Sequence, residues 1–586
     1  MNKNKEIKLK IKLLKLKNAG KYIEAKNIAL QLSKASPKDI EVWYALAQLQ
    51  SQLGEHKKAV VSFSKAYAEK SPFQVEAIER AVDLCVANGF DKQGLAPGEA
   101  LIKMRPKSAD AHFKYGMLLF GSKHYIETEK YYLEAIKLDP DNTKYQNQCG
   151  LLYVHLGENE RSLPYFEKCQ ALKPESKYGY YFHLWSQNYI DGISDANILA
   201  DHQRFGDLLE QKYTNIEPFD NKVGNRLKIG FVSQDFYKHS VAYFFLPIIK
   251  NYSKENWEVF CYSDVKKPDH ITQEIESACD HWCESQHMSD RDLYKKIRSD
   301  KIDIVIDLVG ILGEGRLDLF AMKAAPVQIN YLGYPNTTGL SRMDYRLTDE
   351  WSDPVGMTDQ HFTEKLTRLK TGFLCFQPNL DTPPVSPLPA LGAEGVVTYG
   401  SFNIYQKISP RVYRLWAEIL KSVPNSRLLI KSLPFVEDKL KQRVIETFRA
   451  LGVEKERLEL IGWTIDRNAH LKIYDQVDIH LDSFPYNGTT TTCEAMWQGI
   501  PTLTLAGENH RSRVGASIMH QVNLQSWVAN SDQEYVDIAV RKSADLGSLQ
   551  ELRQSLRNTM LESPLLDSKG FISELESKFN EMIALL

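Results

Sequence analysis

Hydrophobic residues recur in the first third of the chain with the spacing of amphipathic helices. The segment "HYIETEKYYLEAIKLDPDN" (124–142) shows apolar side chains returning every three or four positions, which is the helical period. A second, longer period is also present. Successive units end 34 or 35 residues apart, at Pro37, Ser71, Pro106, Pro140 and Pro174. The pattern predicts an array of repeated helical units.

Other positions repeat within each unit. Gly20, Gly54, Gly89 and Gly157 lie 17 residues before a terminator, and small and aromatic residues recur at later fixed offsets. Small residues let two antiparallel helices approach closely, and an aromatic ring fills the groove that they leave. This is the pattern of the tetratricopeptide repeat (TPR), and we interpret residues 1–205 as a TPR superhelix. Such an array binds an extended peptide or a partner in its groove, and a structural spacer is the alternative.

The third unit departs from this pattern. Its segment "DKQGLAPGEALIKMRP" (91–106) places Pro97 and two glycines where the second helix of the unit is expected. Because proline removes a helical hydrogen bond and glycine weakens a helix interior, we predict that this helix is short or broken.

From Arg226 onward the pattern changes to short apolar runs that alternate with helical segments. Buried strands are predicted within 226–236, 256–264, 301–310 and 325–335, and again within 396–403, 426–432, 457–463, 477–484 and 500–507. The proline-rich stretch 376–395 between the two series is predicted to be a linker. The expected fold is therefore an α-solenoid followed by α/β, with two Rossmann-like domains at 226–375 and 396–586. Ligands of such domains bind beyond the carboxyl ends of the strands.

The amino-acid composition argues against some classes of function. The 586 residues include 73 Lys and Arg against 75 Asp and Glu, a formal net charge of −2. This balance argues against nucleic acid or an anionic membrane as a general partner. The eight cysteines form no CxxC pair, which suggests reduced thiols in a cytoplasm. The lysine-rich N-terminus has no apolar core of a signal peptide, and no run of about 18 apolar residues is present.

Four consecutive threonines open a predicted helix in "FPYNGTTTTCEAMWQGIPTLTL" (484–505). Residues 478–484 are predicted to form a strand, 485–488 a tight loop and 489–498 a helix that stops at Gly499. The amino end of a helix presents unpaired N–H groups and the positive end of the macrodipole, so it favours an anion such as phosphate. Glu494, about one turn later, is placed to accept hydrogen bonds from ribose hydroxyls. The alternative is a hydroxyl-capped helix that packs internally.

Several segments together resemble the O-GlcNAc transferase and SPINDLY group, glycosyltransferase family 41. They are "FVSQDFYKHSV" (231–241), "APVQINYLGYPNTTGLSRMDYRLTD" (325–349), "YGSFNIYQKISP" (399–410), "LWAEILKSVPNSRLLIK" (415–431) and "LDSFPYNGTTTTCEAMWQGIPTLTLAGENHRSRVGAS" (481–517). TPRs ahead of two α/β domains complete the order of the family. The resemblance implies a glycosyltransferase fold of the B type (GT-B). It also implies transfer of a sugar, with inversion, from a nucleotide donor to Ser or Thr of proteins.

The resemblance also implies roles for individual residues. Lys407 matches a lysine that contacts the diphosphate of the donor, and His470 matches a histidine beside the nucleotide base. His239 matches a histidine at the rim of the active site. The helix-end residues that hold the phosphates correspond to Thr489, Thr490 and Thr491, and Glu494 corresponds to the ribose-binding acid.

Some positions depart from the UDP-GlcNAc enzymes. Thr489 replaces a histidine, Glu494 an aspartate and Ile404 a glutamine, while Arg467 and Ile473 stand where those enzymes have lysine and arginine near the uracil. The form "GTTTTCE" resembles the SPINDLY branch, some members of which use GDP-fucose. UDP-GlcNAc is kept as the expected donor, because it is the commoner use of the family, with GDP-fucose as the alternative.

No metal cofactor is implied, because the metal-dependent transferases of the other fold type use a DxD motif at a strand end. The "DRD" at 290–292 lies in a charged helical run, and Asp478, His480 and Asp482 are interpreted as a buried structural network. We expect protein acceptors to bind through the TPR groove, and a homodimer through the repeats is a further hypothesis. A non-catalytic TPR scaffold is the alternative from another function class.

Overall fold

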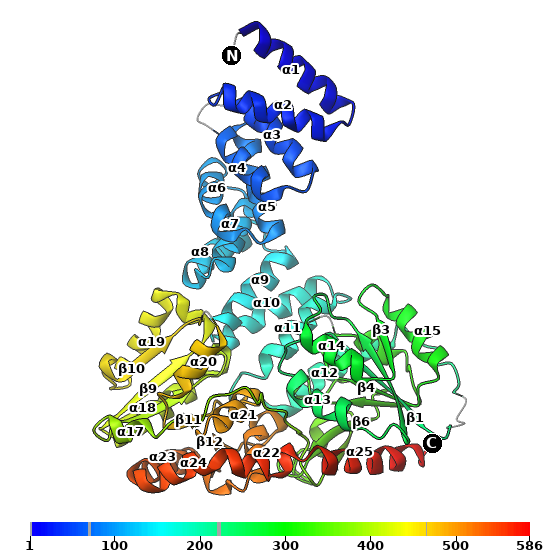
Figure 1. The fold of residues 1–586 in the computed structure, drawn as a ribbon, viewed down its shortest axis with the longest axis vertical. Helices are drawn as coiled ribbons and strands as arrows, with labels where there is room; N and C mark the ends of the chain where they lie inside the picture. The colour runs from blue at the N-terminus through cyan, green and yellow to red at the C-terminus, as the bar shows by residue number, and fades with distance from the viewer. Residues whose placement is uncertain (1–2, 68–71, 220–223, 314, 465) are drawn as a thin grey trace. The chain divides into compact units, whose positions relative to one another are not determined.

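The computed structural model describes residues 3–67, 72–219, 224–313, 315–464 and 466–586 (Figure 1). The side chains of residues 467 and 468 also lie outside the description. The chain divides into two compact units, one made of Met1–Leu156 with Pro164–Pro174 and the other of Gly157–Leu163 with Glu175–Leu586. Each unit is described by itself.

The first unit consists of paired helices. They are α1 (Lys3–Asn18), α2 (Tyr22–Ala35), α3 (Ile40–Gln52), α4 (His56–Ala66), α5 (Gln74–Asn88), α6 (Asp91–Met104), α7 (Ala109–Gly121), α8 (Tyr125–Leu138), α9 (Thr143–His155) and α10 (Asn159–Leu172), the last of which begins in the residues assigned to the second unit. Gly20, Gly54 and Gly89 adopt positive φ where one helix of a pair ends, a conformation that glycine reaches without strain. Ala25 and Ala59 are fully buried at the predicted small-residue positions. The predicted helical repeats are confirmed.

The prediction of a short or broken helix in the third unit is wrong. Helix α6 runs without interruption through Pro97. Gly94 and Gly98 are buried, and a Cβ on either one would lie 2.4–2.6 Å from a side chain of α7, Leu118 or Tyr115. The glycines therefore let α6 pack closely against α7, and this packing offsets their low helix propensity.

The second unit contains two parallel sheets with helices around them. The first sheet has seven strands in the order β3-β2-β1-β4-β5-β6-β7: β1 (Leu227–Ser233), β2 (Trp257–Ser263), β3 (His281–Glu284), β4 (Ile304–Asp307), β5 (Val327–Asn330), β6 (Tyr345–Asp349) and β7 (Lys365–Leu369). Its helices are α13 (Ala242–Asn251), α14 (His270–Ala278), α15 (Asp290–Asp300) and α16 (Leu317–Ala321). The four predicted strands are present, and β3, β6 and β7 are additional strands near the two edges.

The second sheet has six strands in the order β10-β9-β8-β11-β12-β13. They are β8 (Val397–Ser401), β9 (Ser426–Lys431), β10 (Leu458–Ile461), β11 (Ile479–Leu481), β12 (Thr502–Leu505) and β13 (Val528–Ala529). Helices of this part are α17 (Pro389–Gly392), α18 (Pro410–Ser422), α19 (Asp438–Ala450), α20 (Arg467–Tyr474), α21 (Thr490–Trp497), α22 (Val514–Gln521), α23 (Asp532–Ala544) and α24 (Leu546–Leu561). In each sheet the strand order reverses beside the first strand: between β1 and β4 in the first sheet, and between β8 and β11 in the second. The predicted pair of Rossmann-like domains is confirmed.

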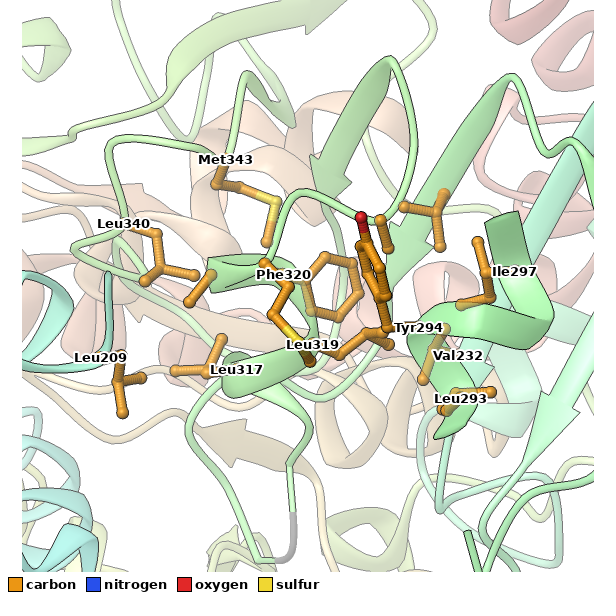
Figure 2. Packing of buried hydrophobic residues seen from close by; sticks show 14 of the residues in the cluster. Leu209, Val232, Leu293, Tyr294, Ile297, Leu317, Leu319, Phe320, Leu340 and Met343 are labelled. Carbon is orange, nitrogen blue, oxygen red and sulfur yellow. The ribbon is translucent and has the colours of Figure 1, made fainter. Parts of the chain in front are cut away.

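Helices from both ends of the second unit pack against the first sheet. Figure 2 shows Leu209 of α12 (Asp195–Glu210) and residues of α15 and α16 gathered in one buried cluster that also contains Val232 of β1. Helix α11 (Lys177–Gln187) contributes Tyr180 and Tyr181 to the same cluster. At the other end, Phe579 of α25 (Ser568–Ile583) stacks on Trp257, with ring centroids 5.2 Å apart, and α25 lies across this half in Figure 1.

The repeat region was predicted to run to residue 205, whereas α11 and α12 lie within the second compact unit. The predicted linker, residues 376–395, contains the short helix α17, and Ser386 within it accepts hydrogen bonds from Arg553 of α24. Throughout the described ranges, we find no helix with the length and apolar character needed to cross a bilayer.

Candidate functional site

A cavity of about 550 Å³ lies where the carboxyl ends of the two sheets face each other. Its lining from the first half comes from the loops after β1, β4 and β5, and its lining from the second half comes from the loops after β8 and β11. These loops include both points at which the strand order reverses, the usual ligand position of doubly wound sheets. Five residues to which the resemblance gives site roles line this one cavity: His239, Lys407, Thr489, Thr490 and Thr491.

The loop between β11 and α21 is held by Asp482. Its fully buried carboxylate accepts hydrogen bonds from the Gly488 N–H at 2.6 Å, the Thr504 hydroxyl at 2.9 Å and the Asn403 amide at 3.3 Å. The Thr491 hydroxyl in turn donates to Asn403 Oδ1 at 2.9 Å. Burial raises the pKa of Asp482 to about 6, and these hydrogen bonds and the nearby Lys407 oppose the shift. Asp482 therefore fixes the loop that leads into the helix.

The amino end of α21 opens on the cavity. Thr489 precedes the helix, and among the described residues its hydroxyl caps none of the helical N–H groups. Thr489, Thr490 and Thr491 are half-buried. A Cβ on Gly488 would lie 2.6 Å from the Thr491 hydroxyl, so glycine is required for this close turn. Helical N–H groups and threonine hydroxyls thus form a donor surface suited to an anion.

Lys407 stands beside this donor surface. It ends the short helix η2 (Tyr405–Lys407) after β8, and its Nζ donates to the Asn487 carbonyl at 2.6 Å. The same Nζ lies 3.8 Å from the centroid of the Tyr486 ring, a cation–π contact. Desolvation lowers the pKa of Lys407 to about 8, and the charge of Asp482 opposes this shift. The ammonium is therefore held in place at the cavity but is poorly solvated there.

His239 lies across the cavity, in the loop after β1. Its Nδ1 is 3.6 Å from a carboxylate oxygen of Asp235 and accepts a hydrogen bond from the Val241 N–H at 3.4 Å. Burial raises the pKa of Asp235, and the neighbouring His239 opposes the shift. The imidazole side chain is 38% exposed, so it can contact a molecule in the cavity.

His470 and Glu494 are placed differently, and neither is among the described residues that line this cavity. His470, on α20, makes edge contacts with Phe402 and Tyr474 at centroid distances of 6.1 and 5.3 Å. Glu494, on α21, is half-buried, and its charge opposes the desolvation that lowers the pKa of Lys431 at the end of β9. Both residues lie in the second half, as the sequence predicted, whereas contact with a nucleotide stays a prediction.

Sequence reasoning missed the aromatic wall of the cavity. Tyr181, Phe182 and Trp185 of α11 line it together with Tyr189, and the Tyr189 and Tyr486 rings contact each other in a tilted arrangement with their centroids 5.3 Å apart. The aromatic run "YGYYFHLW" (178–185) is the signal that could have pointed to this wall. It falls in the segment that was assigned to the repeats, where aromatic residues are ordinary core positions.

The alternating residues Asp478, His480 and Asp482, in and beside β11, make protein contacts rather than a cluster of metal ligands. Asp478 accepts hydrogen bonds from the backbone N–H groups of Ala390 and Thr398, and His480 Nδ1 lies 3.1 Å from the Thr502 hydroxyl. Within the described residues, no group of three or more His, Cys, Asp or Glu side chains is arranged to hold a metal ion. The assignment of these residues to a buried network agrees with the contacts.

The structure also locates the positions at which the sequence departs from the UDP-GlcNAc enzymes. Ile404 is 47% exposed and lines the cavity, and Ile473 is buried in the core around Tyr474. The side chain of Arg467 lies outside the described residues.

Comparison with known proteins agrees with this architecture. Residues 204–377 and 390–575 match the model of a family described as Glycosyl transferase family 41, and residues 40–70, 109–142 and 143–176 match the tetratricopeptide repeat. A mutant of the Thermobaculum terrenum O-GlcNAc transferase, in which a lysine is replaced by methionine, has a similar solved structure. The TM-score is 0.78 at 30% identity, covering 87% of this chain and 97% of that one.

Curated relatives match about two thirds of this chain or a little more. A protein from Oryza sativa subsp. japonica, described as "Probable UDP-N-acetylglucosamine--peptide N-acetylglucosaminyltransferase SPINDLY", is 39% identical over 423 residues, 71% of this chain and 45% of that protein. An Arabidopsis thaliana protein named SEC, with the same enzyme description, is 29% identical over 411 residues, 67% of this chain and 42% of that protein. The chain thus spans less than half the length of these relatives.

Proposed function

The chain belongs to glycosyltransferase family 41, and from this premise we propose that it is a protein O-glycosyltransferase. It transfers a sugar, with inversion, from a nucleotide donor to Ser or Thr hydroxyls of protein acceptors. One observation carries the proposal: the Lys407 ammonium and the amino end of α21 converge on a single cavity between the two halves. A diphosphate is the part of a nucleotide sugar that suits this combination of donors.

The chemistry follows from where charge develops. When the bond between the sugar and the diphosphate breaks, negative charge grows on the leaving phosphate oxygens. A fixed cation and aligned N–H donors stabilise that charge without reorganisation. Lys407, Thr489, Thr490 and Thr491 supply these groups, and they give the charge neutralisation that a divalent metal gives in other transferases. No metal cofactor is part of the proposal.

The acceptor side is proposed to use the opposite wall. Inversion requires the Ser or Thr hydroxyl to attack the anomeric carbon from the face opposite the diphosphate. His239, at the rim, is within the same cavity as Lys407 and is proposed to contact the reacting groups. The main catalytic effects are then orientation of the two substrates and stabilisation of the leaving group.

His470 and Glu494 are proposed to bind the nucleoside. A base is proposed to lie against His470 near Phe402, and the Glu494 carboxylate to accept hydrogen bonds from the ribose hydroxyls. This arrangement requires the nucleoside to extend out of the cavity, past the start of α21 toward α20.

We propose UDP-GlcNAc as the donor, supported by the descriptions of the rice and Arabidopsis relatives. GDP-fucose is the second candidate, and Ile404 favours it. This side chain lines the cavity and offers methyl groups but no hydrogen-bonding atom, which suits the methyl group of a deoxysugar better than a hydroxyl. Protein acceptors are proposed to reach the site through the TPR groove.

The test measures transfer directly. The full chain is incubated with UDP-GlcNAc or GDP-fucose and a mixture of Ser- and Thr-containing peptides, and both nucleotide release and peptide mass are recorded. We expect a mass increase of one N-acetylhexosamine with UDP-GlcNAc, lost in Lys407→Met. An increase of one deoxyhexose would identify the second donor. If both donors bind in a thermal-shift assay and no peptide is modified, the chain is a non-catalytic scaffold.

A further inference from the structure

The Lys407 ammonium lies against an aromatic ring in the cavity between the two halves, here called the donor cavity. Its Nζ is 3.8 Å from the centroid of the Tyr486 ring and donates to the neighbouring Asn487 carbonyl at 2.6 Å. Lys407 and Tyr486 both line this cavity. The quadrupole of a ring stabilises a cation over its face, and most strongly where water is excluded. The ring therefore offsets part of the cost of desolvating this charge.

Hydrogen bonds fix the loop that carries the ring. The Ser483 hydroxyl donates to the Tyr486 carbonyl at 2.9 Å. Asn487 is fully buried; its Nδ2 donates to the Ser483 carbonyl at 2.8 Å, and its Oδ1 accepts from the Gly515 N–H at 3.2 Å. The ring and the carbonyl that contact Lys407 thus belong to one loop whose backbone is held in place.

A second ring lies against Tyr486 and comes from the segment that follows α11. Tyr189 is only 3% exposed, and its ring contacts the Tyr486 ring with the centroids 5.3 Å apart. Trp185 of α11 packs edge-on against Tyr189, also at 5.3 Å. With Lys407 and Tyr189 both against it, the Tyr486 ring is confined to one position.

The residue before Tyr189 is anchored to the first half. Asn188 Nδ2 donates to the Tyr334 hydroxyl at 3.0 Å, and Asn188 Oδ1 accepts from the Asn336 amide at 3.1 Å. All three residues are buried, and Tyr334 and Asn336 belong to the loop after β5. A cation of the second half is therefore contacted by rings that are tied to the first half.

We propose that Tyr486 is a positioning residue for Lys407: its ring keeps the ammonium charged and directed at the donor diphosphate, and Tyr189 holds the ring in place. This inference rests on the proposed function, since it takes Lys407 as the cation that faces the diphosphate. It gives a role in the reaction to two aromatic residues of the cavity wall.

The groups near Lys407 allow the effect of the ring to be isolated. The titratable and charged groups that face Lys407 or the Tyr486 ring come from several elements: Asp482, His239, Tyr189 and Arg346. Burial raises the pKa of Asp482 to about 6, so this carboxylate is ionised from pH 7 to pH 9. Burial also raises the pKa of Tyr486 to about 12, and that of Tyr189 above its usual value, so both rings stay neutral. Because these neighbours are the same in every Tyr486 variant, they cannot produce a difference between the variants.

The experiment measures the protonation of Lys407 with and without the ring. The variants are Tyr486→Met, which removes the ring, and Tyr486→Phe, which keeps it. The matched control is Tyr181→Met, which removes another ring from the lining of the same cavity. The titration of Lys407 is followed in the full chain without donor by NMR of lysine labelled with ¹³C at Cε, and its signal is identified by its loss in Lys407→Met. The pH profile of kcat/KM is measured from nucleotide release.

We expect Tyr486→Met to move the NMR midpoint and the alkaline decline of kcat/KM to lower pH by about one unit. From a midpoint near pH 8, the charged fraction at pH 8 then falls from about 0.5 to about 0.1, so kcat/KM there falls about fivefold through the loss of charge. Tyr486→Phe should keep both midpoints, and so should Tyr181→Met at whatever level of activity it retains.

The outcomes separate this inference from the proposed function. An NMR midpoint that is unchanged or higher in Tyr486→Met overturns the positioning role even if the chain transfers sugar. A lower midpoint in a chain that transfers no sugar supports the role of the ring toward Lys407 and contradicts the enzymatic proposal. If Tyr486→Met does not fold, Tyr486→trifluorophenylalanine keeps the shape of the ring and weakens its quadrupole. Its midpoint should then be lower than that of Tyr486→Phe, and equal midpoints would overturn the inference.

Discussion

Raising the pH from about 7 to about 9 should discharge Lys407 and thereby weaken turnover. The ammonium is desolvated between Tyr486, the Asn487 carbonyl and the cavity, which lowers its pKa to about 8 from an ordinary value of 10.5. If the charged form is the one that stabilises the diphosphate, activity follows the protonated fraction of this residue.

The size of the effect follows from the pKa. The protonated fraction is about 0.9 at pH 7, about 0.5 at pH 8 and about 0.1 at pH 9 for a group that titrates near 8. kcat/KM, which reports the free enzyme, should therefore fall about tenfold between pH 7 and pH 9. kcat should fall less, because a bound diphosphate attracts the proton and raises the pKa of Lys407 in the complex.

The assay is nucleotide release at subsaturating donor across this pH range, with two variants for comparison. Lys407→Arg keeps a positive charge throughout and should remove the alkaline decline, at whatever level of activity its longer side chain allows. Lys407→Met should lower kcat by about 10²–10³-fold, the scale of losing one oxyanion donor, and should show no decline near pH 8. A wild-type profile that is flat from pH 7 to pH 9, or a decline that persists in Lys407→Met, would refute the assigned role.

The same pKa shift opposes folding. The unfolded chain keeps the Lys407 proton up to about pH 10.5, whereas the folded pocket releases it near 8. The unfavourable contribution is thus fully present below pH 8 and disappears as the pH rises toward 10.5. It amounts to at most about 3 kcal/mol. Lys407→Met should therefore raise the Tm of the protein without donor at pH 7, as measured by calorimetry, while it lowers activity.

Three further predictions concern other parts of the second unit. Glu494→Ala should raise the KM for the donor with little change in kcat, and an unchanged KM in initial-rate kinetics would contradict ribose binding. Asp353→Asn should destabilise the fold by about 3 kcal/mol, because the buried Asp353 carboxylate makes a hydrogen-bond contact of 2.6 Å with His510 Nδ1 between the two halves. The pKa of Asp353 is lowered to about 2, so its stabilising contribution is present above about pH 4 and is lost as the pH falls toward 2; urea unfolding at both pH values tests this. Gly206→Ala should lower the Tm by several degrees, since its Cβ would lie 2.1 Å from a backbone oxygen of Gly339, while Gly392→Ala, which meets nothing within 4 Å, should be neutral.

Much of the fold could be predicted because its signals are local. The repeat period, the positive-φ glycines and the alternation of buried strands with helices depend on residues close together in the chain. Two of the strands that were missed lack this signal: β3 has exposed residues at both ends, and β7 begins with an exposed lysine. The third, β6, is nearly all buried but contains the polar residues Arg346, Thr348 and Asp349. Edge strands are covered on fewer sides, so their sequences carry less apolar character.

The candidate site could be predicted only in part. The threonines of α21 and Lys407 stand in recognisable segments, and the structure brings them to one cavity with His239. The aromatic wall of α11 could not be assigned, because nothing in the local pattern says which sheet this helix packs against. For helix α6, the local sequence gave a wrong prediction. Its proline and glycines predicted a broken helix, but close packing against α7 stabilises a continuous one.

By itself, the sequence determined the identity of the elements, the two parallel sheets and the chemical character of the loops that follow β8 and β11. Tertiary structure alone decided which side chains share a cavity and how Lys407 is desolvated. The physical reason is the separation along the chain of the residues that determine each property. Helical and strand periods arise from neighbouring residues, whereas burial, pKa and cavity shape arise from groups that are far apart in the chain and meet only when the halves of the second unit pack together.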